Sequence, residues 1–198
     1  MNKVITTAAV ILCLAGSAHA GDARTSHGRS SAMASTSHTV LLGVDVDAAL
    51  PVGNYSNANG FGAGALLNVE YPAIEQLSLT GRVGFQFHTN KSITAFGATI
   101  DNHVHSIPVL LGAKYYVLQQ DRQGLFAAAE MGLFGLMIGA SSGATSASDT
   151  QMKFGVGAGL GYQWKEWSAR VNVHTHDVGN FGDAVMLTGG VGYQFAGF

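Results

Sequence analysis

The segment from Lys153 to Trp164, KFGVGAGLGYQW, alternates glycine with apolar residues. Glycine stands at 155, 157, 159 and 161, and Phe154, Val156, Ala158, Leu160 and Tyr162 alternate with these glycines. Because successive side chains of a β-strand point to opposite faces, this segment has one apolar face and one face almost without side chains when it is extended. Such a strand needs a hydrophobic environment on one side and a crowded space on the other.

The same period of two restarts from His38 to the C-terminus and predicts eight strands. They span about 39–50, 61–71, 77–88, 103–117, 125–138, 153–164, 167–176 and 184–195. The segment at 125–138 is apolar on both faces apart from Glu130, and read alone it could be a membrane helix with glycines on one face. It is short for a span of about 20 residues, and its neighbours favour a strand.

The lengths of the strands and of their connections predict the fold class. Strands of about ten residues cross a bilayer when they are tilted. The connections alternate between long polar segments, at 51–60, 89–102, 139–151 and 177–183, and short ones, at 72–76, 118–124 and 165–166. This alternation is typical of an all-β, eight-stranded antiparallel up-and-down transmembrane β-barrel with its short turns in the periplasm.

Aromatic residues are expected to form a girdle at the short-turn end of such a barrel. They are Tyr71, Tyr115, Tyr116, Tyr162, Trp164, Trp167, Tyr193 and Phe195.

Charged residues within the strands share the face opposite to the apolar one, so we expect them to point into the lumen. They are Asp45, Asp47, Glu70, Arg82, Lys114, Glu130, Lys153 and Arg170. Each would be costly to bury alone, but four acids and four bases can pair inside a wet lumen. The glycine face of 153–164 is predicted to leave room for long side chains from other strands.

The N-terminus has the pattern of an export signal. Lys3 is followed by an apolar core from Val4 to Gly16 and by Ala18-His19-Ala20, a small-x-small cleavage site. We therefore predict a cleaved signal peptide at 1–20, a disordered lead at 21–37 and the barrel at 38–198. The single cysteine, Cys13, lies in the signal, so the exported chain has no thiol for a disulfide or a metal site.

Charge and motifs exclude several classes of function. A formal net charge of −2 gives no basic surface for nucleic acid. The GAGLG run lacks the strand-then-helix context of a dinucleotide site, and we expect no cofactor.

Three segments resemble a known superfamily: LPVGNYS, GFGAGALLNVEY and GVGAGLGYQW are similar to segments of the small porin-like outer-membrane β-barrels. That group includes the opacity-type and outer-membrane-protein-W-like barrels, and the resemblance covers about 38–198. It implies an outer-membrane protein in contact with lipid and lipopolysaccharide, inserted by the assembly machinery and expected to be a monomer. It also implies a C-terminal aromatic assembly signal, but counting back by twos from Phe198 leaves the apolar face. Whether Phe195 or Phe198 closes the last strand is therefore open.

Three functions fit this architecture. The first is a non-enzymatic barrel with a structural or interaction role, or a narrow pore for small solutes. The second is a lipid A-modifying enzyme, because VNVHTHDVGN faintly resembles the His-x-Ser-Asn segment of lipid A deacylases. In this chain His176 stands where that segment has serine, so the hydroxyl nucleophile that acyl transfer needs is missing.

The third function is metal binding by two pairs of histidines, His103 with His105 and His174 with His176. The two pairs lie on strands that are not neighbours and face opposite sides of the wall. We interpret them as amphipathic residues near the outer interface, and keep His174 and His176 as the candidate ligands of a metal-binding barrel.

The export signal and the lipid-facing strands generate the first testable prediction. The mature protein should fractionate with the outer membrane, and its mobility on an unheated detergent gel should differ from that of the boiled sample. Recovery in the soluble periplasm would contradict the barrel assignment.

Overall fold

The computed structural model describes residues 39–95, 98–117, 122–142 and 145–198. The predicted signal peptide at 1–20 and the lead at 21–37 lie outside the described residues. Among the described residues, no helix has the length and apolar character needed to span a membrane.

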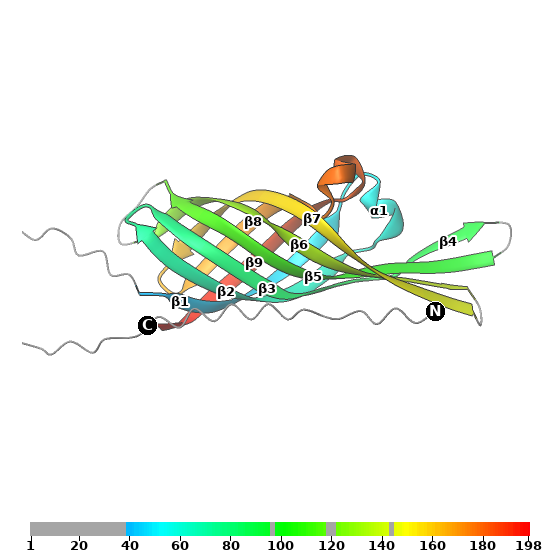
Figure 1. Cartoon of the computed structure of the whole chain (residues 1–198), viewed down its shortest axis with the longest axis horizontal. Helices are drawn as coiled ribbons and strands as arrows, with labels where there is room; N and C mark the ends of the chain where they lie inside the picture. Colours follow the sequence, from blue (N-terminus) through cyan, green and yellow to red (C-terminus); the bar gives the residue numbers. More distant parts are fainter. Residues whose placement is uncertain (1–38, 96–97, 118–121, 143–144) are drawn as a thin grey trace, which may run out of the picture. The chain divides into compact units, whose positions relative to one another are not determined.

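Nine strands form one antiparallel sheet that closes on itself (Figure 1). They are β1 Leu41–Pro51, β2 Gly62–Ile74, β3 Leu77–His88, β4 Lys91–Ala95, β5 Ala98–Tyr116, β6 Gly124–Ser142, β7 Thr145–Trp164, β8 Trp167–Thr175 and β9 Val185–Gly197. Strand β1 pairs with β9, and β3 pairs with β5, while β4 pairs only with β5. The barrel wall therefore has eight strands, which confirms the predicted fold.

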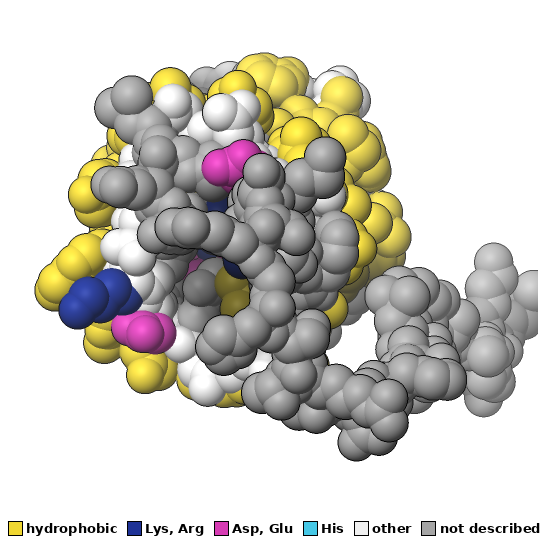
Figure 2. All heavy atoms as spheres, turned by 90° about the vertical axis from the view of Figure 1, so that its left-hand side faces the viewer, with side chains coloured by type: hydrophobic (Ala, Val, Ile, Leu, Met, Phe, Trp, Pro, Cys, Tyr) yellow, Lys and Arg dark blue, Asp and Glu magenta, His cyan; other side chains and the backbone are white. Residues whose placement is uncertain are grey.

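The two faces of the wall have opposite character, as the alternation predicts. Large apolar side chains such as Val46, Leu67 and Leu111 are exposed, and Figure 2, which looks onto the short-turn end, shows hydrophobic side chains over the outer wall. The charged residues of the strands, apart from Lys153, are buried inside. Some apolar side chains also point inward. Leu66 is one of them, and Gly84 on β3, which pairs with it, has no Cβ to clash with it.

The glycine face of β7 gives long side chains the space that the sequence predicts. A Cβ at Gly157 would lie 2.9 Å from Nδ1 of His174. Likewise a Cβ at Gly155, Gly159 or Gly161 would collide with Phe134, Asn172 or Phe126, respectively. Glycine in β7 therefore allows side chains from β6 and β8 to fill the lumen, which an eight-stranded barrel can hold only in close packing.

Two connections expected as loops are β-structure instead. The segment 89–102 contains β4 and the start of β5, and 139–151 contains the ends of β6 and β7. β8 begins to pair with β7 only at Val156, so among the described strands Thr145–Gly155 pairs with β6 alone. Most side chains of 89–102 and 139–151 are small or polar, so hydrophobic alternation is weak in these two segments. The other long connections contain α1, Tyr55–Ala58, and the 3-10 helix η1, Val178–Asp183.

The aromatic girdle is present with one correction. Seven of the expected residues are exposed, but Tyr116 points into the lumen and is 2% exposed, because its hydroxyl donates to Glu70.

Strand β9 continues beyond Phe195 and ends at Gly197. The register with β1 shifts between Leu42 and Gly43, and Phe198 exchanges two backbone hydrogen bonds with Val40. Both Phe195 and Phe198 are exposed, and the role of either as assembly signal stays a prediction.

The register of β7 generates a prediction on the lipid face. Val156 pairs with Thr175, the last residue of β8, so Val156 lies near the rim. Leu160 pairs with Val171 at mid-strand and is 60% exposed. The Leu160→Arg variant should destabilise the barrel by about 2–4 kcal/mol, because the charge enters hydrocarbon near the midplane.

Val156→Arg is the matched control, because the same charge lies nearer to water and should cost less. Urea unfolding of both variants in one lipid measures the difference. An equal cost at the two positions would contradict the assignment of the midplane.

Candidate functional site

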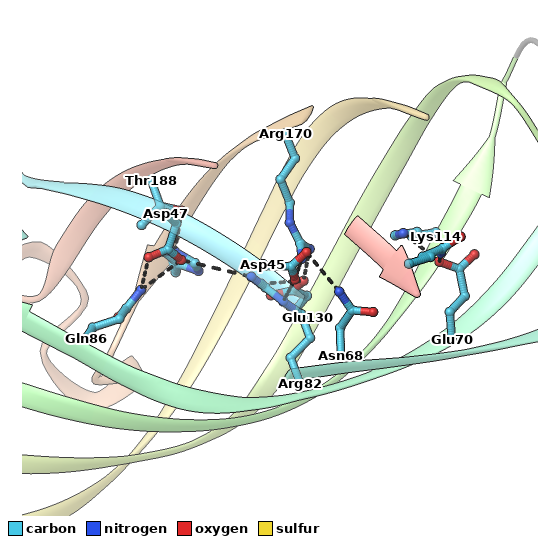
Figure 3. Close-up of polar contacts among 12 residues, drawn as sticks. Asp45, Asp47, Asn68, Glu70, Arg82, Gln86, Lys114, Glu130, Arg170 and Thr188 are labelled. Carbon is cyan, nitrogen blue, oxygen red and sulfur yellow. Dashed lines mark hydrogen bonds and ion pairs between the residues drawn. The ribbon is translucent and has the colours of Figure 1, made fainter. Parts of the chain in front are cut away.

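Four charged side chains from four strands meet in the middle of the lumen (Figure 3). Arg82 on β3 binds Asp45 on β1 through Nε, at 2.9 Å from Oδ2, and Glu130 on β6 through Nη1, at 3.0 Å from Oε2. Arg170 on β8 binds the same two acids, with Nη1 at 3.0 Å from Oε1 of Glu130 and Nη2 against Oδ2 of Asp45. We call these four residues the charge ring.

The charge ring is buried, and amides and a further acid extend it. Asn68 donates to Asp45 at 2.9 Å, and Gln86 donates to Asp47 at 3.2 Å while accepting from Ser106. Asp47 is also 4.0 Å from Nη2 of Arg82. Each carboxylate of the ring contacts both guanidinium groups, so the loss of one charge leaves two partners incompletely paired. Removal of one partner of a buried ion pair is strongly destabilising for this reason.

A second group lies nearer to the short-turn end. Lys114 on β5 contacts Glu70 on β2, with Nζ at 2.6 Å from Oε2. The hydroxyl of Tyr116 and the amide of Gln194 donate to the same carboxylate, at 2.9 and 3.1 Å. The ammonium of Lys114 also lies 4.9 Å from the centre of the Phe126 ring. This Lys114–Glu70 group lies between the charge ring and a pocket of about 160 Å³ at the short-turn end, which Glu70, Tyr116 and Gln194 help to line.

Lys153 does not join the other seven charged residues in the lumen. It lies on the part of β7 beyond the rim, where its Nζ is 2.9 Å from Oδ2 of Asp177. The alternation of side chains along the strand assigned Lys153 to the inward face, but β7 at this residue lies beyond the end of the lumen, and the side chain is partly exposed. The hydrogen bond from Lys153 lowers the pKa of the Asp177 carboxyl. Stability from this pair is therefore present above the ordinary pKa of an aspartate and is lost as pH falls through the lowered value.

A third group closes the outer mouth, and we call it the mouth cluster: Tyr55, His88, His176 and Met186. Tyr55 of α1 points into the barrel and is 8% exposed. Its ring stands edge-on to His88 and His176, with centroids 6.2 and 5.4 Å away. His88 places Nε2 3.4 Å from Sδ of Met186. Sequence alternation predicts that His88 faces inward, but no local signal in the first long connection shows that Tyr55 returns into the lumen.

The candidate histidines are separated by the fold. His105 lies outside, against the rings of Phe85 and Phe87, while the side chain of His103 is not among those described. His174 and His176 are buried inside, and Nε2 of His174 is 2.9 Å from the hydroxyl of Thr188. Within the described residues, no three or more His, Cys, Asp or Glu side chains are arranged to hold a metal ion.

The geometry of the charge ring predicts the effect of removing one carboxylate. Glu130→Ala leaves Arg82 and Arg170 sharing Asp45, and should destabilise the barrel by roughly 3 kcal/mol. Glu166→Ala is the control, because Glu166 is exposed in a short turn and its loss should change stability by less than about 0.5 kcal/mol. Urea unfolding midpoints provide the measurement, and equal midpoints for the two variants would contradict a structural role of the ring.

No family model matches the chain, and no curated protein matches its sequence. Its structure is similar to Ail, the attachment invasion locus protein of Yersinia pestis, with a TM-score of 0.51 and 15% identity over 79% of this chain and 97% of that one. Ail in complex with the heparin analogue sucrose octasulfate gives 0.50 and 16% over 79% and 97%. Neisserial surface protein A gives 0.50 and 16% over 79% and 97%.

At 15–16% identity these comparisons show the fold. The contact of the barrel with lipid follows instead from the side chains on its outer surface. A closed barrel satisfies its backbone groups internally, and only an apolar solvent suits its exposed valine and leucine belt. The chain therefore has the fold of the small eight-stranded outer-membrane β-barrels, and its outer wall is suited to contact with lipid.

Proposed function

We propose that this protein is a closed outer-membrane barrel that acts through its protruding hairpins as an interaction protein, and not as a pore. The observation that carries the proposal is the charge ring, in which two arginines and two acids span the lumen from four strands. An ion that crosses the barrel would have to separate these pairs.

Packing above and below the ring supports a closed lumen. Tyr55 and Met186 are buried at the outer mouth, and the Lys114–Glu70 group lies toward the other end. A cavity between the ring and that group, lined by Thr80, Arg82 and Lys114 among others, measures about 10 Å³. This volume holds about one water molecule, which is too little for a continuous aqueous path.

The hairpins beyond the rim support a role in binding. β4 pairs only with β5, and Thr145–Gly155 of β7 pairs only with β6. Each hairpin therefore ends in a strand whose outer edge has no strand pairing among the described residues. Such edges are templates for the addition of an extended polypeptide strand. We propose a polypeptide as the partner.

Charge at the long-loop end argues against a sulfated polysaccharide such as the heparin analogue bound by Ail. The long connections and hairpins carry Lys91 and Lys153 against Asp101, Asp149, Asp177 and Asp183, two bases against four acids. A surface of net charge −2 repels a polyanion.

The deacylase alternative lacks a suitable nucleophile. The hydroxyl next to His174 belongs to Thr188, and both side chains are buried in the lumen, away from the lipid face. A lipid A acyl chain approaches from the outer wall, so this pair does not support an acyl-transfer site.

Single-channel recording in planar bilayers tests the proposal against the narrow-pore alternative. The refolded wild-type protein should show no steady conductance steps, since its lumen is filled at three levels. Val156→Ala, a change outside the lumen, should be equally silent. Reproducible conductance steps from wild-type protein whose folding has been verified by the gel shift would overturn the closed-lumen proposal.

A further inference from the structure

The mouth cluster contains a concentration of buried polar atoms without partners. Among the described residues, these atoms are both ring nitrogens of His176 and the hydroxyl of Tyr55, and the side-chain amide of Asn59, at the end of α1, is unpaired as well. His176 is 0% exposed and Asn59 is 1% exposed. Buried donors and acceptors normally find partners, so a group of unpaired ones in one place indicates that the place is built to hold something else.

His88 and Met186 already have the geometry of two ligands of one ion. Nε2 of His88 is 3.4 Å from Sδ of Met186, although the two residues lie on β3 and β9, with β2 and β1 between them. Small residues on the intervening strands allow this approach. A Cβ at Gly62 would lie 2.7 Å from the His88 ring, and Ala49 packs against Met186.

The chemistry of these donors selects the ion. Neutral imidazole and thioether are soft or borderline ligands, and thioether sulfur in particular selects monovalent copper over magnesium, calcium or manganese. The nearby carboxylates do not compete, because Asp45 and Glu130 are bound to arginines. We propose that His88 and Met186 form a site for a soft monovalent ion, Cu(I) or Ag(I), at the outer mouth of the barrel, in the same cluster as the unpaired ring nitrogens of His176.

Tyr55 covers this site from the long-loop end. Its ring stands edge-on to both His88 and His176, and α1 carries it on the connection between β1 and β2. An ion from outside the cell reaches Met186 only when this connection moves. The Tyr55→Ala variant should therefore bind the ion faster than the wild-type protein does.

The test uses Ag(I), which needs no reductant, and Cu(I) under anaerobic conditions, with refolded protein in detergent and a chromophoric chelator as competitor. The wild-type protein should bind one equivalent. Met186→Leu conserves volume and should fold, but it removes the sulfur and should weaken binding by at least about tenfold. His88→Gln should weaken it similarly, with folding checked by the gel shift.

Met152→Leu is the matched control, because Met152 carries a thioether that is 64% exposed on the protruding part of β7. It should bind as the wild-type protein does. X-ray absorption of the copper-loaded protein should show a sulfur scatterer that Met186→Leu removes and Met152→Leu retains. Binding by folded Met186→Leu with unchanged affinity, or no binding by the wild-type protein, would show that the His88–Met186 contact is only a hydrogen bond and would overturn the proposal.

Discussion

Opposite charges that can be buried only together are the interaction on which this barrel depends. Asp45, Arg82, Glu130 and Arg170 come from β1, β3, β6 and β8, so strands around the whole wall are tied at one level. Side chains of this length bridge the lumen only in a narrow barrel. A slip of one residue in any of these strands would turn its charge toward lipid. The ring therefore specifies strand register as well as filling the space.

The alternation of the sequence was sufficient for the parts of the chain that lipid surrounds. Eight strands, their inward and outward faces, and the space above the glycines of β7 all follow from one apolar and one polar face. The prediction failed where that contrast ends. Few apolar side chains mark the hairpin of β4 and β5 or the segment Thr145–Gln151 as strands. Lys153 has the strand alternation of the lumen-facing residues, but it lies at the rim and binds Asp177.

Contacts between distant segments were beyond sequence reasoning for a different reason. Tyr55 lies in a connection that resembles a solvated loop, and Met186 shares its strand face with Thr188 and Gly190. Nothing local shows that these side chains meet His88 and His176 across the mouth. Tyr116 is similar, because an aromatic residue near a membrane interface fits a girdle equally well until Glu70 is seen opposite. Closure of the barrel, and not strand propensity, decides these positions.

The outer half of β7 has a consequence for distance. From Thr145 to Gly155 this strand continues for eleven residues beyond the point where β8 leaves it. At roughly 3.3 Å per residue that is about 35 Å of strand, comparable with the thickness of the hydrocarbon core itself. Strand tilt makes the height of the hairpin above the lipid less than this length, and the exposed Met152 and Phe154 are apolar side chains that suit lipid rather than water. The polar part, Thr145–Gln151, carries the hairpin farther from the hydrocarbon than any residue of β8.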